Sequence, residues 1–388
     1  MTLWRRIEPV DICIFRGNRL FGSPGTLADS LMPPWPSVFS GALRSRMLVD
    51  RGVDLAEYAG GRRPEGPLGE VLGTPEAPGS FAVGAVALWQ GREKRAVFPL
   101  PQDLRVRVPE GEGASPVVSR LEAVPWSEGG MLGGQSFLPR VLADRSGRLE
   151  KPRGEYWITA EGLRRYLEGR CPDARHLVGA GHLWKWDSRL GIGLSDERRT
   201  VEEGLLYTAE TVAMEPGTAF LVEVRGCPEE LLPRDGLVRL GGDGRGAHLS
   251  PAEPPLAEPL PAPGTPFFLM AATPGLFPGG GWLPGLKREA GEWWLHWEQV
   301  RARLVAVALG RPVIVSGWDL ATHRPRPAQR AVAPGAVYFF DRVEGRAEDP
   351  TRQMWKALLE EAPEPQRGLW LQRKAEGFGR LLAGQWNG

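Results

Sequence analysis

Short runs of alternating apolar and polar residues recur along this sequence, and they predict a protein built mainly from strands. The first run is residues 10–15, where alternate apolar side chains would share one face. The segment PPWPSVFSGALRSRMLVDRG then changes to a helical spacing, with Ser37 as its expected N-cap and Gly52 as its end. The apolar stripe of this helix consists of Phe39, Ala42, Leu43 and Met47.

The rest of the first 250 residues continues the strand-rich pattern. Residues 81–88 and 96–100 predict a hairpin, and TAETVAMEPGTAFLVEV predicts strands on either side of a turn at 216–217. A short helix is expected in PEELLPRD, before a final strand at 237–240. Residues 101–180 are rich in Gly, Pro and Arg, and we interpret them as an insertion or long loops.

A proline-rich stretch marks the expected domain boundary. The segment SPAEPPLAEPLPAPG contains six prolines and has no regular periodicity, which favours an extended, semi-rigid linker over residues 251–264. We therefore predict a first domain of residues 1–250, with insertions near 53–80 and 101–180. A second domain is predicted for residues 265–388.

The predicted order of strands and helices in the second domain repeats that of the first. A helix is expected in DPTRQMWKALLEE, with Asp349 as N-cap and Pro350 at its first position, and GFGRLLAGQW supplies a closing strand. The other predicted strands are 267–272, 304–309, 313–316 and 337–340. Strand, helix, hairpin, helix and strand form the split βαβ pattern. The predicted fold is therefore α+β, with two tandem ferredoxin-like (RRM-like) domains and long Gly/Pro-rich loops.

Composition adds limits on function. The chain has 37 Pro, 51 Gly and 42% hydrophobic residues, which is typical of a globular protein with many turns. The net charge is only +1, but nearly all of the 48 basic residues are Arg. Arg pairs with phosphate and stacks on bases, so the surplus fits RNA binding, although GC-rich codons or thermal adaptation explain it equally well. Any nucleic-acid site must then be a local groove.

Two further classes of protein are disfavoured. No apolar run approaches a membrane span and the N-terminus resembles no signal peptide, so we expect a cytoplasmic protein without membrane contact. Cys13, Cys171 and Cys227 lie far apart, which favours buried free thiols over disulfides or a metal site. No metal or other cofactor is predicted.

No enzyme motif is found. The sequence lacks a phosphate-binding GxxxxGK[ST] loop, HExxH, GxSxG and a Rossmann glycine set. His182 and His323 lie in polar surroundings and are candidates for general bases in RNA cleavage. A structural or surface histidine is the commoner role for such positions, so we do not predict an enzyme.

The segment LGGDGRGAHLS is the most unusual local feature. Gly242 and Gly244 lack a Cβ, so that backbone amides can approach a phosphodiester closely. Arg245 lies among these glycines, and Asp243 is placed to orient it. A flexible hairpin turn is the simpler interpretation.

The helix at PSVFSGALRS offers a second candidate site. Ser37, Gly41 and Arg44 fall on one face, opposite the apolar stripe, with Ser40 beside them. Hydroxyls, a small residue and an arginine near a helix N-terminus suit a phosphate. Capping and a solvated face explain the same residues as well.

Two further segments combine basic and aromatic residues. In WKWDSRLGIGLSDERRTVEEGLLY, tryptophans 184 and 186 share a strand face, which more often means core than base stacking; an extended hairpin toward RNA or a neighbouring subunit also fits. The basic residues of this segment are Arg189, Arg198 and Arg199. In the second domain, tryptophans 282 and 318 accompany Lys287, Arg288, Arg324, Arg326 and Arg330, which suits single-stranded RNA or simply shaped loops.

Taken in order, several segments resemble one family: the third subunit of the type III-B CRISPR (Cmr) effector complex, a RAMP protein. The matching segments are FRGNRLFG, LMPPWPSVFSGALRSRML, LGIGLSDERRTVEEGLLY, LGGDGRGA, TPGLFPGGGWLP, VSGWDLATHRPRPAQRAVAPGAVYFF and GFGRLLAGQW. Each is weak alone, but the ordered set spans nearly the whole chain. The family more often has Glu where this chain has Asp243.

The resemblance implies two ferredoxin-like domains packed face to face and no catalytic role. It implies that the chain binds the repeat-derived 5′ handle of the CRISPR RNA, beside the large polymerase-like subunit and the first backbone RAMP subunit. The RNA-binding residues carried over are Ser37, Ser40, Arg44, Arg189, Arg198, Arg199, Gly242, Gly244, Arg245, Lys287, Arg288 and Arg330.

Three alternatives remain open at this stage. A repeat-cleaving endoribonuclease of related fold would use His182 or His323. A scaffold would contact only protein. The paralogous subunit of a type III-A (Csm) complex would share the fold and differ in its partners.

Overall fold

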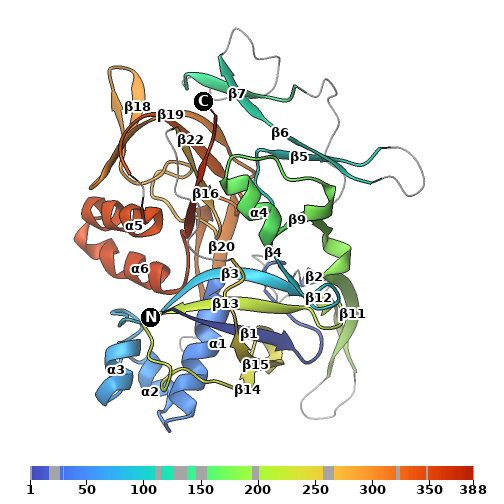
Figure 1. Ribbon diagram of the computed structural model, residues 1–388. Coiled ribbons are helices and arrows are strands. Elements are labelled where there is room, and N and C mark those ends of the chain that lie inside the picture. Colours follow the sequence, from blue (N-terminus) through green and yellow to red (C-terminus); the bar gives the residue numbers. More distant parts are fainter. Residues whose placement is uncertain are drawn as a thin grey trace.

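The computed structural model describes residues 2–16, 27–28, 30–109, 115–125, 138–145, 155–194, 201–256, 266–319, 324–346 and 348–387. The fold is α+β, with two large antiparallel sheets and few helices, as predicted (Figure 1). The predicted linker lies mostly outside the described residues, and the domain boundaries remain a prediction.

The first sheet has the strand order β10-β9-β4-β3-β13-β1-β15-β14, and all neighbours are antiparallel. Its strands are β1 (Thr2–Pro9), β3 (Ala82–Gln90), β4 (Arg95–Pro99), β9 (Tyr156–Thr159), β10 (Leu177–Gly179), β13 (Ala219–Arg225), β14 (Gly236–Arg239) and β15 (Gly246–Ala252). Helix α1 (Pro36–Val49) connects β1 to β3, which run parallel on either side of β13. Together they form a split βαβ unit. No α-helix occurs in residues 226–245, between β13 and β15.

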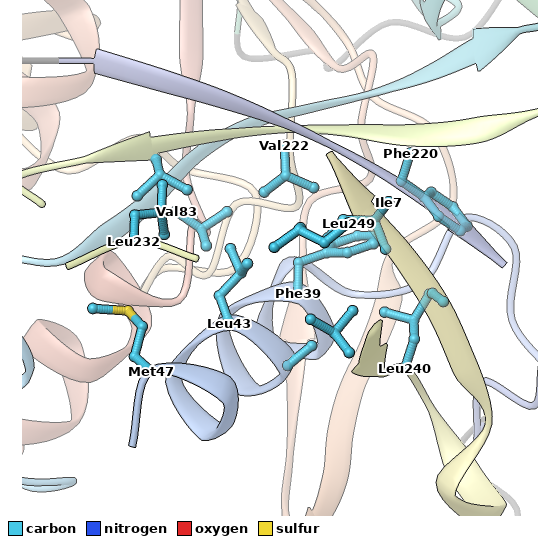
Figure 2. Packing of buried hydrophobic residues seen from close by; sticks show 14 of the residues in the cluster. Ile7, Phe39, Leu43, Met47, Val83, Phe220, Val222, Leu232, Leu240 and Leu249 are labelled. Carbon is cyan, nitrogen blue, oxygen red and sulfur yellow. The ribbon is translucent and has the colours of Figure 1, made fainter. Parts of the chain in front are cut away.

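Helix α1 covers one face of this sheet, and Figure 2 shows the contact. Phe39, Leu43 and Met47 are fully buried, so the predicted apolar stripe is confirmed. The sheet residues that receive them are Ile7, Val83, Phe220, Val222 and Leu249. Burying a side chain of this size stabilises the fold by about 1.5–3 kcal/mol. The short helices α2 (Leu55–Ala59) and α3 (Gly66–Leu72) extend the same core.

The second sheet has the order β17-β18-β19-β22-β16-β23 and is also antiparallel. Its strands are β16 (Phe267–Ala271), β17 (Leu286–Glu289), β18 (Glu292–Trp297), β19 (Val300–Ala308), β22 (Val337–Gly345) and β23 (Leu381–Gln385). Helices α5 (Pro350–Glu361) and α6 (Glu364–Ala375) connect β22 to β23, which are parallel on either side of β16. Residues 272–285, after β16, contain turns and no helix.

A shared core joins the two sheets. Ala87, Phe98 and Leu221 of the first sheet pack in one cluster with Phe268 and Phe339 of the second. Helix α4 (Ala160–Leu167) contributes three buried side chains to this cluster, namely Leu163, Tyr166 and Leu167. The two halves are therefore one packed body rather than separate units on a linker.

A buried polar triad lies inside this shared core. The hydroxyl of Tyr166 donates a hydrogen bond to Asp103 Oδ1 at 2.7 Å, and Arg120 Nε donates to Asp103 Oδ2 at 2.8 Å. Asp103 is fully buried. The Arg120 guanidinium also lies 4.9 Å from the ring of Phe268, across the boundary between the halves. Burial raises the pKa of the Tyr166 hydroxyl well above its usual range, which keeps it a donor.

Pairs of strands extend from the two sheets. The longest are β11 (Trp184–Leu194) and β12 (Val201–Met214), which form an antiparallel arm with β2 (Leu27–Ala28) beside β12. The others are β5 (Leu104–Arg107) with β6 (Val117–Arg120), β7 (Glu122–Pro125) with β8 (Arg140–Ala143), and β20 (Val313–Asp319) with β21 (Arg324–Ala331). Regular structure thus runs through much of the segment interpreted as long loops.

The first predicted strand was wrong. The strand is Thr2–Pro9, and Val10 after it is 58% exposed. The sequence TLWRRIEP looks too polar for a central strand, but the structure gives its buried cation a partner. Arg5 Nε donates a hydrogen bond to the carbonyl of Pro233 at 2.8 Å. Pairing of this kind lets a charged residue occupy a core strand.

Two predicted helix features were also wrong. Trp35, not Ser37, is the N-cap of α1, and Ser37 lies in its first turn. The segment PEELLPRD forms turns rather than a helix, and the amides of Leu231 and Leu232 both donate to the carbonyl of Pro228. Prolines at both ends leave this segment too short for a helix.

Other elements are confirmed. Strands β3 and β4 form the predicted hairpin, and β16, β19, β20, β22 and β23 lie where strands were predicted. Asp349 caps α5, with its carboxylate accepting from the amide of Arg352 at 3.0 Å, and Pro350 follows it. Helix α6 and strands β17 and β18 were missed.

Candidate nucleic-acid interface

One flank of α1 carries the residues predicted to bind phosphate. Ser37 is partly exposed in the first turn, and a Cβ added at Gly41 would meet nothing within 4 Å. Ser40 is only 1% exposed, and its hydroxyl is enclosed. Ser40 therefore lies beneath the surface, where it cannot reach a ligand directly, and Arg44 follows it one turn later on the same flank.

Arg44 is held in an unusual environment. Its guanidinium lies 5.3 Å from the centre of the Phe81 ring, and the residue as a whole is partly exposed. Among the atoms that the structure describes, neither Nε nor Nη2 has a hydrogen-bond partner, although both are enclosed. Burial lowers the pKa of Arg44, while the nearby Tyr58 and Glu376 oppose that shift. The cation is thus only partly compensated by its surroundings.

The second half supplies the other side of this environment. Arg326 Nη1 donates to Glu376 Oε1 at 3.0 Å, and Arg373 Nη1 donates to Glu376 Oε2 at 2.9 Å. Arg373 Nε also donates to Gln329 Oε1 at 2.9 Å. We call Arg44, Arg326, Arg373 and Glu376 the junction cluster. It sets three guanidinium groups against one carboxylate.

Close packing holds the two sides of the junction cluster together. Gly377, directly after Glu376, has a φ of 97°. A Cβ at this position would lie 2.9 Å from Val83 of β3 and 3.1 Å from Pro36 of α1. Only glycine fits a backbone that comes this close in this conformation. The end of α6 is thereby fixed against the start of α1.

The glycine loop, residues 241–245, connects β14 to β15. Gly241, Asp243 and Gly244 all have left-handed φ values, of 78°, 54° and 61°. The amide of Gly242 donates to the carbonyl of Ile14, which anchors the loop. Residues 242–244 form a single 3-10 turn, after which the amide of Arg245 donates to the carbonyl of Gly242. Asp243 and Gly244 are both exposed, so this turn is open to a ligand.

Arg245 closes the loop with a partner that was not predicted. Its Nη1 donates to Asp11 Oδ2 at 3.4 Å, and in the described structure Asp243 forms no hydrogen bond or ion pair with it. The side chains of Arg245 and Asp11 are 33% and 61% exposed, so the pair is weak. The prediction that Asp243 orients Arg245 was therefore wrong, and Asp11 is the residue that pairs with Arg245.

The glycine loop and the junction cluster lie on opposite flanks of α1. Arg46 Nη1 donates to the carbonyl of Leu237 in β14, which places the loop's hairpin along that side. Residues two positions apart on a helix point about 200° apart. Arg44 therefore faces away from this hairpin, toward Phe81 and the second half. Ser37 and Gly41 occupy the exposed surface between the two sites.

Comparison with known proteins identifies the family. A family model described as "CRISPR-associated protein (Cas_Cmr3)" matches residues 5–386. The chain belongs to the Cas_Cmr3 family. The resemblance read from the ordered motifs is thereby confirmed, and the chain is a Cmr3-type subunit of the type III-B system.

Solved structures share the fold of this Cas_Cmr3 chain. One is a chain of the type III-B Cmr-beta bound to cognate target RNA and AMPPnP, with a TM-score of 0.54 and 14% sequence identity over 98% of this chain and 96% of that chain. Another, from Cmr-beta bound to cognate target RNA, has a TM-score of 0.53 with the same identity and coverage. Among curated proteins, none matches the sequence.

The arm of this Cas_Cmr3 chain places one predicted basic residue at the surface. Arg189 Nε donates to Asp187 Oδ2 at 2.8 Å and is half exposed. Trp184 is buried against Trp157, whereas Trp186 is 47% exposed. The two tryptophans thus divide between core and surface. Arg198 and Arg199 lie outside the described residues.

The remaining predicted residues are scattered over the second half. Lys287 and Arg288 are exposed on the edge strand β17, and Arg330 is exposed on β21. Trp282 is partly buried and stacks on Trp293 at 4.3 Å, so it belongs to the core rather than to a base-stacking surface. The side chain of Trp318 lies outside the described residues. In the described structure, Lys287, Arg288 and Arg330 form no hydrogen bond or ion pair with the junction cluster or the glycine loop.

The other candidate chemistry is sparse. His182 is exposed in a single 3-10 turn, and His323 lies outside the described residues. Over the described ranges, no group of three His, Cys, Asp or Glu side chains is placed to hold a metal ion. No helix in the described chain is long and apolar enough to cross a bilayer. All three cysteines are free, as predicted; Cys13 and Cys227 are buried, whereas Cys171 is exposed, so the predicted burial was wrong for Cys171.

Three residues of this interface, Tyr58, Arg373 and Glu376, were not predicted, and Arg326 was noted only as one of several basic residues. Arg326, Arg373 and Glu376 lie more than 280 residues from Arg44 in the sequence. No local spacing signals such a contact, so only the folded structure brings them together.

Proposed function

We propose that this chain is a non-catalytic CRISPR RNA-binding subunit of a type III-B Cmr effector complex in the cytoplasm. It would hold the repeat-derived 5′ handle and bridge the large polymerase-like subunit to the backbone RAMP subunit. Support comes from the family match over residues 5–386 and from the fold shared with chains of RNA-bound Cmr-beta. The glycine loop, in which the exposed residues Asp243 and Gly244 lie beside Arg245, is the observation that carries the proposal.

The loop suits an RNA backbone for a physical reason. Gly242 is helical and Asp243 left-handed, and this alternation turns successive N–H groups toward one side, where they attract an anion. Arg245 adds a positive charge that its exposed partner Asp11 neutralises only weakly. These donors recognise phosphate rather than a base, so they position the guide without reading its sequence.

The mechanism is positional. Guide and target RNA recognise each other by base pairing, whereas protein subunits hold the guide by its backbone and ends. A handle held at the glycine loop cannot pair with a target. The exposed face of α1 around Ser37 and Gly41 then offers the handle a path across the helix.

We also propose that each half is a ferredoxin-like βαββαβ unit in which one helix is missing. The strand orders β15-β1-β13-β3 and β23-β16-β22-β19 support this, because both place the fourth, first, third and second strands side by side. The first half keeps the helix after its first strand, and the second keeps the helical connection before its last strand.

The test is a pull-down of the tagged chain from its native host, with sequencing of the recovered RNA and mapping of its 5′ ends. The wild type should recover CRISPR RNAs that share one repeat-derived 5′ end. Arg245→Ala combined with Gly244→Val should reduce that recovery about tenfold, because Val is strained at the left-handed φ of 61°. Arg234→Ala, which removes an exposed cation outside the loop, is the matched control.

Each result separates the candidate functions. Recovery of RNA without a common 5′ end would contradict handle binding, and normal complex assembly without RNA crosslinks to the loop would indicate a scaffold. Cleavage of repeat RNA by the pure chain, lost in His182→Ala, would indicate an endoribonuclease. The co-purifying subunits distinguish a Cmr complex from a Csm complex.

A further inference from the structure

The junction cluster has more positive charge than its own carboxylate can balance. Glu376 is shared between Arg326 and Arg373, and its two oxygens are both engaged. The Nε and Nη2 atoms of Arg44 make no hydrogen bond in the described structure, and its guanidinium lies over the ring of Phe81. A half-buried cation with unpaired N–H donors is costly, so its presence favours a compensating anion.

The cluster also has a neutral donor that lacks an acceptor. The hydroxyl of Tyr58 is enclosed and unpartnered in the described structure, and it is among the groups that act electrostatically on Arg44. Burial raises the pKa of Tyr58, so the hydroxyl keeps its proton. Enclosed in this way, like the hydroxyl of Ser40, the Tyr58 hydroxyl does not contact a ligand directly, and Arg44 is the group that an oxyanion meets. No acidic residue of the cluster competes for the place, because Glu376 is already occupied.

An anion can reach this cluster from solvent. Arg44 is partly exposed, whereas its Nε and Nη2 are enclosed. The side chain of Arg326 is 34% exposed while Nη1 holds Glu376. The two partly exposed arginines come from different halves of the molecule and act electrostatically on one another.

We propose that Arg44 and Arg326 bind one phosphate group of a single-stranded RNA backbone at the boundary between the two halves. This site rests on the proposed RNA-binding function and adds to it a second point of attachment, separate from the glycine loop. Guanidinium groups bind phosphate through paired N–H donors, and a site shared by two halves fixes the strand relative to both.

A second consequence distinguishes this role from a structural one. If Arg44 served only to hold the halves together, its replacement by a shape-matched apolar residue would destabilise the protein. If it awaits an anion, Arg44→Met should leave the melting temperature unchanged or raise it, because the variant no longer encloses an uncompensated charge. RNA binding should nevertheless weaken about tenfold, the loss expected for one charged hydrogen-bonded contact.

The deciding experiment measures binding of a handle-bearing RNA to the full chain by fluorescence anisotropy. Each phosphate of the RNA is replaced in turn by an uncharged methylphosphonate. With the wild type, replacement of one particular phosphate should reduce the affinity about tenfold, more than replacement of any other. In Arg44→Met, replacing that same phosphate should cause no further loss of affinity. Replacing any other phosphate should reduce the affinity by the same factor as in the wild type. The salt dependence of binding should also become shallower by about 0.7, the value for one phosphate contact to a single strand.

Two variants serve as comparisons. In Arg326→Met, replacing the same phosphate as in Arg44→Met should no longer reduce the affinity. In Arg46→Met, on the opposite flank of the same helix, that replacement should still reduce the affinity, because Arg46 is engaged by Asp50 and the carbonyl of Leu237. Losses in Arg44→Met that are additive at every phosphate position, or normal binding by that variant, would overturn the proposal. So would a marked drop in its melting temperature without a change in the phosphate pattern.

A scrambled RNA of the same length separates this proposal from the function on which it rests. Preference for the handle without coupling between Arg44 and one phosphate would remove the junction site alone. Coupling at one phosphate without preference for the handle would remove handle recognition and leave the junction site standing. A wild-type chain that binds neither RNA would contradict both.

Discussion

The two halves of the molecule place four strands in the same order but cover them with helices at different points of the chain. In the first half, α1 follows the first of the four strands, and the connection between the third and fourth strands has no α-helix. In the second half, α5 and α6 occupy that later connection, and turns follow the first strand. Each half therefore uses one helical connection to cover a sheet that has room for two.

The difference explains where the candidate binding groups lie. The glycine loop belongs to the connection between β13 and β15, which is the place that α5 and α6 fill in the second half. Exposed backbone is available there because no α-helix occupies this connection. The second half, in turn, brings the end of α6 against α1 and completes the junction cluster. The first half therefore has the exposed glycine loop in the connection that the second half fills with helices.

The largest expected effect comes from breaking the triad between the halves. Asp103→Ala leaves Arg120 and the hydroxyl of Tyr166 buried without their partner. We expect a loss of about 3–5 kcal/mol in the free energy of unfolding, measured by urea denaturation. Both halves should unfold in one transition, because the triad lies in their shared core.

An exposed aspartate provides the control for this variant. Asp173 pairs with Arg175 at 3.3 Å, and both side chains are more than half exposed. Asp173→Ala should change stability much less than Asp103→Ala. A stability loss of similar size in the two variants would mean that the triad does not hold the halves together.

Matched truncations compare the cores of the two halves. Leu43 of α1 and Leu358 of α5 are buried to 0% and 1% exposure, in separate clusters. Each change to Ala should cost about 2–5 kcal/mol. Hydrogen exchange should show the first sheet opening more often in Leu43→Ala and the second sheet in Leu358→Ala. Equal exposure of both sheets in either variant would show that the halves do not have distinct cores.

The sequence predicted elements where one local signal was enough. The hairpin of β3 and β4, the stripe of α1 and the cap of α5 each depend on residues within about a dozen positions. The first strand was misplaced because its charged residues are tolerated only through a distant partner, as Arg5 with Pro233 shows. The pattern of polar and apolar residues within one segment cannot reveal a partner that lies 228 residues away in the sequence.

The candidate site divides in the same way. The glycine loop was predicted because four glycines around one arginine are visible in a single segment. Arg44 was predicted from its helix face, but its partners were not, since Arg326 and Glu376 reach it only through the packing of α6 against α1. A helix N-cap depends on backbone angles as well as residue type, which is why Ser37 was assigned wrongly.

A smaller effect is expected from an arginine of the second half that is fully paired. Arg303 Nε and Nη2 donate to the two oxygens of Asp341, both at 2.8 Å, and these bonds raise its pKa. Arg303→Met should cost about 1–3 kcal/mol, because it leaves the half-buried carboxylate of Asp341 without its cation. The expected contrast with Arg44→Met, which should cost nothing, can be read from paired thermal melts. Equal losses would mean that Arg44 is compensated as well as Arg303 is.

The smallest expected effect separates the two ways in which the main helices begin. The carboxylate of Asp349 accepts from the amide of Arg352 at the start of α5, whereas α1 begins after Trp35 without a side-chain cap. Asp349→Ala should therefore cost about 1 kcal/mol. Ser37→Ala should cost no more than a few tenths of a kcal/mol, as expected of a surface position without a cap. A loss near 1 kcal/mol in Ser37→Ala, measured by the same urea titration, would mean that its hydroxyl does stabilise the helix start.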